Sequence, residues 1–244
     1  MKRETWCACL LVFLFMVSGC AEQEKITTIS PGVLSVAVTS ESPNSRYDPQ
    51  LWIRRYVEKF AEEESLRIEW TVVSFDRSWA LASNDAVDLV ATNVASFSDR
   101  VVSGSTFSDP FLYERRALSI RPADAESLQT IDDFIGQKVG VVAGMAAEID
   151  VNRRAPSGVD IITAASFGEL YSEFEIGRLD AIAEAEYYDL AGEVIPSHDN
   201  DVVLVDHHDL NPGFREESIF VTRDESENLL ENLNLFISKT HFPL

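Results

Sequence analysis

Cysteine is almost absent from this chain of 244 residues, and it is confined to one end. Cys7, Cys9 and Cys20 lie within the first twenty residues, so the rest of the chain can form neither a disulfide bond nor a thiolate metal site. His207 and His208 offer imidazole ligands, but adjacent histidines seldom reach one metal ion without further ligands. No pair of nucleophile and base and no cofactor-binding loop is apparent, so we expect neither a metal nor a cofactor.

Basic residues are also few compared with acidic ones. The chain has 20 lysine and arginine residues against 41 aspartate and glutamate residues, which gives a formal net charge of −21. Nucleic acids and anionic membrane surfaces attract basic protein surface, so neither is expected as a partner. Hydrophobic residues make up 45% of the sequence and charged residues 25%, which is typical of a folded globular protein.

A long apolar run is also missing. The segment 7–17, which follows Lys2 and Arg3, is too short for a stable membrane span and has the length of the hydrophobic region of a signal peptide. It ends in the sequence VSGC, which resembles the bacterial lipobox. On that resemblance, residues 1–19 are a lipoprotein signal peptide, and Cys20 is acylated and becomes the new first residue. A plain secretory signal peptide and a membrane helix are the alternatives.

A tether is expected to follow the anchor. Residues 20–31 are polar and without periodicity, which predicts a flexible link between the lipid and the folded part. Two or three acyl chains on Cys20 hold a protein durably in a bilayer. In enteric bacteria an aspartate after the lipidated cysteine tends to retain a lipoprotein in the inner membrane. Here Ala21 follows. We expect a protein of the periplasmic space that is anchored to a bacterial membrane, with the choice between inner and outer membrane open.

Alternating and helical apolar patterns succeed each other along the chain. Residues 34–38 alternate between apolar and small or polar side chains, as in a strand, whereas apolar residues recur at helical spacing from 49 to 65. A strand pattern at 139–142 and a helix pattern at 166–177 repeat this succession further on. The order predicts an α/β fold, in which ligands bind beyond the carboxyl ends of the strands.

The stretch from Val87 to Phe111 carries the strongest functional signal. A short apolar run predicts a buried strand, and a polar loop with Ser96, Ser98 and Arg100 follows it. The sequence TFSDP at 106–110 forms a second turn, because proline and its neighbours stop any helix. Arginine can grip a carboxylate with two parallel hydrogen bonds, and serine hydroxyls supply further donors. The loop therefore predicts a site for a small anionic ligand.

This order of strand, hydroxyl pair, acid, arginine and FSDP resembles the extracellular solute-binding proteins of family 3, which are type II periplasmic binding proteins for amino acids and related solutes. Three further segments resemble the family: GVLSVAVTS at 32–40, QKVGVVAGMAAE at 137–148 and GRLDAIAEAE at 177–186. The resemblance implies an α/β fold of two lobes joined by two hinge crossings, with the ligand held between them. Lobe 1 would comprise residues 32–113 and 206–244, and lobe 2 residues 114–205.

The resemblance also implies a set of ligand-binding positions from the loops around the cleft. They are Arg100, Ser98 and Ser96 from the central loop, Phe75 and Tyr47 from two other first-lobe loops, Gly144, Met145 and Ala146 from a turn before a second-lobe helix, and Glu184 and Glu186 from a late strand. Relatives usually carry Gly-Thr-Thr at the second-lobe turn, so the backbone donors remain here and the hydroxyls are lost. Phe75 and Tyr47 have an alternative role as ordinary packing residues.

The place that binds a ligand's ammonium group in amino-acid binders departs from the family. Five residues after Asp180, where relatives carry an aspartate, this chain has Ala185. Glu184 and Glu186 flank it, and alternation along a strand points both to the same face. Either acid can take over by a small shift in register, or the ligand has no ammonium group.

These features predict a lipid-anchored binding protein that captures a small solute with a carboxylate, an amino acid or a close analogue, for an ABC importer. One alternative is a stand-alone sensory or regulatory module similar to the amino-terminal module of the membrane-bound lytic transglycosylase F family, with a sensor as its partner. Another is an enzyme, since cyclohexadienyl dehydratases share the fold and Glu184 or Glu186 could donate protons. Fold does not settle function, and without a nucleophile and base pair we expect no enzyme.

Overall fold

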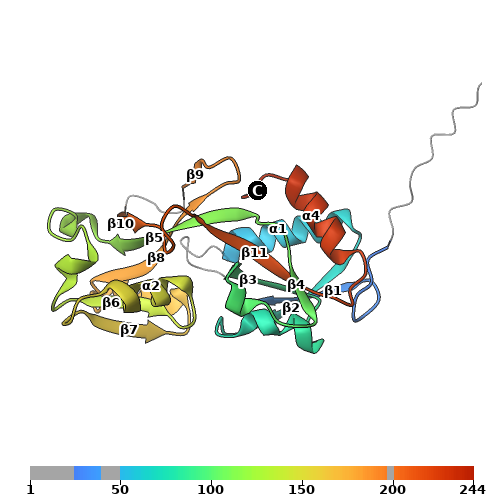
Figure 1. Cartoon of the computed structure of the whole chain (residues 1–244), viewed down its shortest axis with the longest axis horizontal. Helices are drawn as coiled ribbons and strands as arrows, with labels where there is room; N and C mark the ends of the chain where they lie inside the picture. Colours follow the sequence, from blue (N-terminus) through green and yellow to red (C-terminus); the bar gives the residue numbers. More distant parts are fainter. Residues whose placement is uncertain (1–24, 40–49, 197–200) are drawn as a thin grey trace, which may run out of the picture.

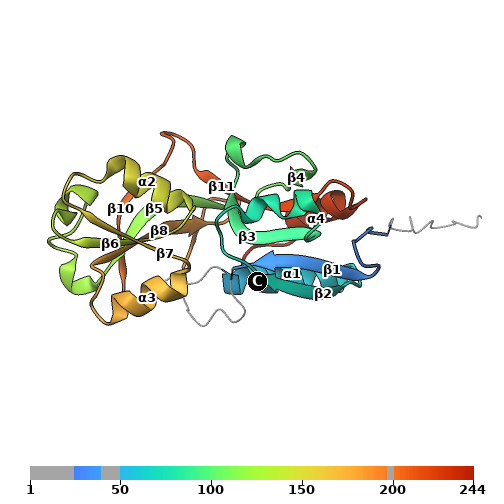
Figure 2. The same cartoon turned by 90° about the horizontal axis from the view of Figure 1, so that it is seen from below.

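The computed structural model describes residues 25–39, 50–196 and 201–244, and every structural statement below concerns these residues. Cys20 and Tyr47, for which a lipid anchor and a ligand contact are expected, lie outside them. Figures 1 and 2 show two lobes, each with strands and packed helices, which are joined by long strands. The two-lobed α/β architecture expected from the sequence is thus confirmed.

Strands and helices alternate along the chain. The strands are β1 (Val33–Val38), β2 (Arg67–Val72), β3 (Leu89–Ala95), β4 (Ser105–Phe107), β5 (Leu112–Ile120), β6 (Lys138–Val142), β7 (Asp160–Ala164), β8 (Ala181–Tyr188), β9 (Val194–Ile195), β10 (Val203–His208) and β11 (Glu216–Arg223). The α-helices are α1 (Gln50–Glu63), α2 (Ala146–Arg154), α3 (Phe167–Glu175) and α4 (Leu229–Lys239). Five short 3-10 helices complete the described part: η1 (Ser78–Ala80), η2 (Ala82–Asn84), η3 (Ser98–Arg100), η4 (Pro122–Asp124) and η5 (Ile131–Phe134).

All strands of the described residues belong to one sheet. Its path is β2-β1-β3-β11-β5-β8-β6-β7, with β4 beside β11, β9 beside β8 and β10 beside β5. In the first lobe β1 runs parallel to β2 and β3, and in the second lobe β6 runs parallel to β7 and β8. The strands between these parallel parts pair antiparallel. Each lobe therefore has a small parallel sheet whose helices cover its faces, and the antiparallel strands connect the two.

The chain passes from the first lobe to the second along β5 and returns along β11. β5 pairs with β8 along its length, from Tyr113↔Tyr188 to Ile120↔Ala181, so the two strands form a ribbon between the lobes. β11 joins this ribbon through the pair Glu216↔Glu114 before it enters the first lobe beside β3. β10 lies against the second-lobe half of β5. Side chains near Glu114 therefore lie at the junction of both lobes.

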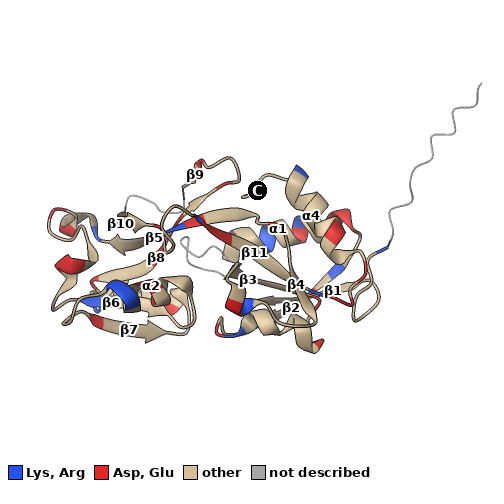
Figure 3. Cartoon of the chain, viewed as in Figure 1, with Lys and Arg blue, Asp and Glu red and all other residues tan. Residues whose placement is uncertain are grey.

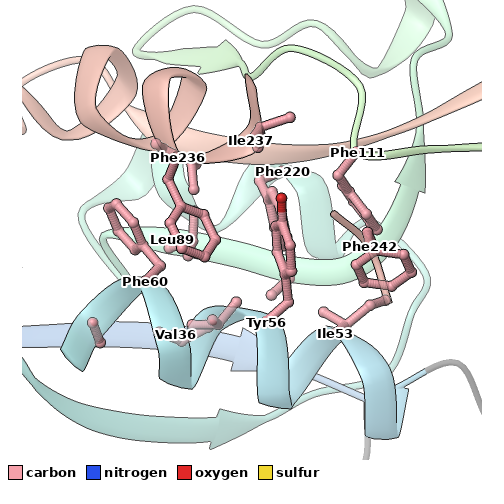
Figure 4. Packing of buried hydrophobic residues seen from close by; sticks show 14 of the residues in the cluster. Val36, Ile53, Tyr56, Phe60, Leu89, Phe111, Phe220, Phe236, Ile237 and Phe242 are labelled. Atoms are coloured by element: carbon pink, nitrogen blue, oxygen red, sulfur yellow. The ribbon is translucent and has the colours of Figure 1, made fainter. Parts of the chain in front are cut away.

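The first lobe is held by an aromatic core between α1, α4 and the sheet (Figure 4). Tyr56 of α1 lies at its centre, with ring centroids 4.8 Å from Phe236 and 5.1 Å from Phe242. Phe111 and Phe220 stack on each other at 4.4 Å beside it. The Tyr56 hydroxyl donates to the carbonyl of Thr240 at 2.8 Å, so its polar end is satisfied despite burial.

The helices pack on the sheet through one apolar face each. The helical spacing from 49 to 65 is confirmed by α1, which has 14 residues and buries Ile53, Tyr56, Val57 and Phe60. In the second lobe, two apolar clusters lie on the two sides of β6, around Val141 and Val142. Within the described ranges, no helix has the length and apolar character needed to cross a membrane.

Candidate binding site between the lobes

A small cavity lies where the two lobes meet. Its volume is about 20 Å³, close to the space that one water molecule needs. The second lobe contributes Met145, Ala146, Ala147 and Phe167, and the first lobe with the crossing strands contributes Phe75, Asn93, Ala95, Arg100, Glu114, Arg116, Glu184, Ala185 and Tyr187. The lining thus combines apolar and small side chains with two arginines, two glutamates and one asparagine.

Arg100 reaches this cavity from η3, which follows β3 directly. The residue is 2% exposed. Its guanidinium carbon lies 4.7 Å from the ring centre of Trp79, 4.8 Å from that of Phe97 and 5.3 Å from that of Phe75. Aromatic faces at these distances attract a cation, so the three rings hold the guanidinium in the gap between the lobes.

The hydrogen bonds of Arg100 end on backbone carbonyls. Nη1 donates to Ala95 O at 3.4 Å within the first lobe, and Nη2 donates to Gly144 O at 2.8 Å in the second lobe. No acid of the described chain lies within ion-pair distance of this guanidinium. Burial lowers the pKa of Arg100 below its usual value, while the more distant Asp99 and Glu114 act in the opposite direction. Arg100 is thus a buried cation whose hydrogen-bond partners are neutral, which favours an anion beside it.

The second-lobe turn before α2 faces Arg100 through Gly144. This residue has a φ of 78°, a conformation that glycine adopts without steric cost. A Cβ atom there would lie 3.2 Å from the Cα atom of Asp76 in the first lobe. The Gly144 amide donates to Glu148 Oε2 at 2.8 Å, while its carbonyl accepts from Arg100. The turn therefore lets the lobes approach closely, and the amide and the carbonyl of Gly144 both already form hydrogen bonds.

Charged residues lie on β5 and β11 where these strands run between the lobes (Figure 3). Arg116 donates to Glu114 on the same strand, and its Nε atom lies 3.0 Å from Glu216 Oε1 on the neighbouring strand. Ser218 Oγ, at 2.5 Å, and Asn93 Nδ2, at 2.8 Å, also donate to Glu114 Oε1. We call these five residues the hinge cluster: Asn93, Glu114, Arg116, Glu216 and Ser218.

Burial and neighbouring charges shift two pKa values in the hinge cluster. Burial raises the pKa of Glu216 to about 7; Arg116 acts against this rise, whereas Glu114 adds to it. Burial also disfavours the charge on Arg116, but Glu216 and Glu114 outweigh it and hold the pKa of this guanidinium above its usual value. Arg116 is therefore always charged, and Glu216 changes its charge near neutral pH.

Asn93 belongs to the hinge cluster because β3 is irregular at this point. The register between β3 and β11 shifts between the pairs Ile219↔Val94 and Val221↔Val90, and Asn93 lies in the shift with a φ of 64°. Asparagine tolerates this left-handed conformation better than most residues. Irregularities of this kind re-aim side chains, and here the amide of Asn93 turns toward Glu114.

Glu184 and Glu186 lie in different surroundings. Glu184 lines the cavity, and its carboxylate accepts hydrogen bonds from Tyr171, at 2.8 Å, and from Ser119. Glu186 is outside the lining, accepts from Tyr188 and lies 3.6 Å from His207 Nε2. Of the two acids expected to bind a ligand's ammonium group, only Glu184 reaches the cavity, and two hydroxyls already occupy it.

Comparison with known proteins supports the resemblance that the sequence motifs indicate. No protein-family model matches the chain. An L-cystine-binding protein of Escherichia coli strain K12 is 25% identical over 179 residues, which cover 73% of this chain and 64% of that protein. The match thus spans less than two thirds of the relative's length.

Solved structures decide the fold. An amino acid ABC transporter substrate-binding protein of Streptococcus pneumoniae, bound to L-arginine, superposes with a TM-score of 0.65 at 19% identity, covering 85% of this chain and 88% of that one. An ancestral amino acid-binding protein, a precursor of cyclohexadienyl dehydratase, gives a TM-score of 0.67 at 19% identity, covering 85% and 89%. The fold is that of the type II periplasmic binding proteins. The resemblance to the family 3 solute-binding proteins is confirmed with it.

The type II fold brings part of the predicted ligand set together. Arg100, Phe75, Met145, Ala146 and Glu184 line the cavity, and Gly144 touches it through its bond to Arg100. The two serines of the central loop lie elsewhere. Ser96 Oγ donates to Glu217 on the surface, and Ser98 is exposed. The wall position in this stretch is taken by Ala95, because alternation along β3 turns Ser96 to the other side.

Sequence reasoning missed eight of the residues that line the cavity, and among them are Asn93, Glu114 and Arg116, whose side chains are strongly polar. Glu114 and Arg116 had a readable signal, since two opposite charges lie two residues apart in a strand that is otherwise largely apolar from Leu112 to Ile120. Such a pair on one strand face indicates a buried ion pair. Asn93 gave no comparable signal, because its orientation depends on the register shift with β11.

The histidines near the second hinge bind acids of the same lobe. His208 Nε2 lies 2.5 Å from Asp150 Oδ1, and Arg154 donates to Asp150 as well as to Asp206. Within the described ranges, no three His, Cys, Asp or Glu side chains are arranged to hold a metal ion.

Proposed function

We propose that this chain is a solute-binding protein that captures a small carboxylate-bearing solute, an amino acid or a close analogue, between its lobes for delivery to an ABC importer. The observation that carries the proposal is the buried guanidinium of Arg100, whose hydrogen bonds within the described chain end on backbone carbonyl groups at the lobe junction. A carboxylate can replace the Gly144 carbonyl and accept two parallel hydrogen bonds. The L-cystine-binding and L-arginine-bound relatives support an amino acid as the solute class.

Capture requires the lobes to part, because the closed cavity of about 20 Å³ is far smaller than any amino acid. A solute held by Arg100 from one lobe and by the walls at Met145, Ala146 and Phe167 from the other would favour the closed state. The solute can shift the free-energy balance between the open and closed states by as much as its binding free energies to these two states differ.

Binding fits the site better than catalysis does. Glu184 is the acid in the cavity that could donate a proton, but it accepts hydrogen bonds from Tyr171 and Ser119. Both hydroxyls already engage the Glu184 carboxylate, so a substrate would have to displace them to reach it. We therefore propose a binding protein and no enzyme.

A thermal-shift screen with amino acids, small organic acids and muropeptides tests the proposed function. A solute that binds only the folded protein is expected to stabilise it by about 2.7 kcal/mol at 100 times its Kd. For a chain of this size the melting temperature would rise by roughly 5–10 °C. Calorimetry of each hit gives the Kd and the stoichiometry. A shift with muropeptides alone would point to the cell-wall module instead and contradict capture of an amino acid.

The proposed location is the periplasmic space, with Cys20 acylated and inserted in a bacterial membrane. Replacing Cys20 with serine is expected to move the protein from the membrane fraction to the soluble periplasmic fraction, because serine offers no thiol for acylation. Cys9→Ser serves as the control, since that residue precedes the proposed cleavage site. Continued membrane fractionation of C20S would contradict lipid anchoring.

A further inference from the structure

A second pocket lies outside the interlobe cavity, between the end of α2, the end of β10 and the loop of residues 209–213. Its volume is about 590 Å³, which is in the range of sites for small molecules. Arg115 reaches it from β5, because alternation along this strand turns Arg115 away from Glu114 and Arg116, which line the interlobe cavity. We call it the arginine pocket after three of its lining residues, Arg115, Arg153 and Arg154.

The charge of the arginine pocket is opposite to that of the chain. In the whole sequence, acidic residues outnumber basic ones by 41 to 20. In the pocket, three arginines and His208 lie beside two aspartates, Asp150 and Asp209. Two of the arginines come from the last turn of α2, where Figure 3 shows basic residues. Cations gathered in a concave site of an acidic chain favour an anion as the ligand.

One of the two aspartates is already neutralised. Asp150 is 3% exposed, accepts two hydrogen bonds of 2.9 Å from Arg154 and lies 2.5 Å from His208 Nε2. Arg154 also donates to Asp206, at 2.7 Å. Burial acts against the charge on His208, but the hydrogen bond to Asp150 outweighs it and raises the pKa of this imidazole above its usual value. Arg154 and protonated His208 therefore balance Asp150 and Asp206.

The other two arginines of the pocket keep most of their donors for a ligand. Arg115 Nη2 donates to the carbonyl of His207, and Arg153 Nη1 donates to that of Leu210, both at 3.3 Å. Arg115 Nε has no hydrogen bond within the described chain, since Asp209 Oδ1, at 3.7 Å, is too distant for one. Each guanidinium has five N–H donors. Two cations with Asp209 as their neighbouring acid leave one positive charge in excess.

We propose that the arginine pocket is a second binding site, for a small molecule with an oxyanion group that Arg115 and Arg153 hold between them. Guanidinium groups bind phosphate and carboxylate groups through pairs of parallel hydrogen bonds, so both oxyanions fit this chemistry. The volume of the pocket leaves room for the rest of a small molecule. The site shares no lining residue with the interlobe cavity and is independent of the proposed function.

Titration of the purified protein with sodium phosphate and with sodium citrate tests the site. Both titrations are made by calorimetry at constant ionic strength, with sodium chloride as the reference, because general attraction between charges is screened equally by all salts at the same ionic strength. We expect at least one of the two oxyanions to bind with a stoichiometry of one. Tighter binding of phosphate indicates a phosphate compound as the ligand, and tighter binding of citrate indicates a carboxylic acid.

Two variants of the pocket are expected to act in opposite directions. Arg153→Gln should weaken the binding of the oxyanion by about tenfold or more, since hydrogen bonds between charged groups are lost, and the exposed position lets the fold persist. Asp209→Asn should strengthen it by about two- to fivefold, because it removes the acid beside Arg115. Damage to the fold would lower affinity and does not explain a gain.

Two control variants locate the binding. Arg178 is an exposed arginine of the same lobe that pairs with Glu173 at 3.2 Å, so Arg178→Gln removes an equal charge outside the pocket. Arg100→Ala removes the cation of the interlobe cavity instead. Both variants should bind phosphate and citrate like the wild-type protein.

Several outcomes would overturn this inference. Binding no better than that of chloride, or wild-type affinity in R153Q, would mean that the pocket holds no oxyanion. An equal loss in R178Q would indicate general attraction to positive charge, and a loss in R100A would place the oxyanion in the interlobe cavity. A dimer that forms without added oxyanion and dissociates in R153Q, as measured by sedimentation, would assign the pocket to an acidic group of a second copy.

Discussion

Replacing Arg100 with alanine is expected to weaken the binding of carboxylate solutes by at least about 100-fold, which corresponds to about 2.7 kcal/mol. The guanidinium is the cation of the cavity that meets no carboxylate within ion-pair distance in the described chain. Its removal would leave the solute carboxylate buried without a counter-charge, and the desolvation cost adds to the lost hydrogen bonds. Isothermal titration calorimetry with the hits of the screen measures the effect.

The same change also affects the fold, so a matched control is needed. Alanine at position 100 removes hydrogen bonds to two carbonyls and contacts with three aromatic rings, which we expect to lower the free energy of unfolding by about 1–3 kcal/mol. Arg121 is its structural counterpart far from the cavity. It donates to the carbonyls of Phe174 and Leu179 and lies 4.2 Å from the ring centre of Phe174.

Arg121→Ala should therefore lower stability to a similar extent and leave solute affinity unchanged. Urea unfolding of both variants, beside calorimetry on the folded proteins, separates stability from binding. Wild-type affinity in folded R100A, or an equal loss of affinity in R121A, would refute the role of Arg100 as the carboxylate ligand.

Replacing Glu216 with glutamine is expected to stabilise the protein at pH 8 relative to wild type, and much less at pH 5. Folding raises the pKa of this carboxyl from 4.5 to about 7, chiefly through burial. The stability that such a group contributes is fully present below pH 4.5, where it is protonated in both states, and is lost as the pH rises to 7. Glutamine resembles the protonated acid and does not titrate.

The difference in the free energy of unfolding between E216Q and wild type should therefore grow by on the order of 2 kcal/mol between pH 5 and pH 8, in favour of E216Q. Chemical unfolding curves at both pH values measure it, with the exposed neighbour variant Glu217→Gln as the control that should show no such growth. A constant difference between E216Q and wild type across this range would mean that Glu216 keeps an ordinary pKa in the fold.

Much of the fold could be predicted from the sequence because local patterns and tertiary packing agree there. The alternation at 34–38 and the helical spacing from 49 to 65 correspond to β1 and α1, whose apolar faces meet in the aromatic core around Tyr56. Where periodicity is weak, prediction is weak too. β4 and β9 have three and two residues, and too few side chains alternate in them to mark a strand.

Five predicted residues line the cavity, and each of them was read from a local stretch of sequence: Phe75, Arg100, Met145, Ala146 and Glu184. Arg100 follows a clear strand and turn, and it lines the cavity between the lobes, while its role as a ligand residue stays a prediction. The hinge cluster instead combines β3, β5 and β11, and residues 93 and 216 meet there only through strand pairing across the sheet. No single stretch of sequence shows that these strands are neighbours, so the cluster can be recognised only once the strand order is known.

In the closed protein the carbonyl of Gly144 accepts a hydrogen bond from Arg100, so it competes with any solute carboxylate for this guanidinium. On the proposed function, a solute carboxylate would have to displace this carbonyl, which belongs to the same chain and is therefore present at a high effective concentration. The binding free energy of a solute would then be the difference between two interactions of this guanidinium, one with the solute carboxylate and one with the Gly144 carbonyl. We expect displacement of the carbonyl only by acids that bind the guanidinium with both carboxylate oxygens, or that make additional contacts elsewhere in the cavity.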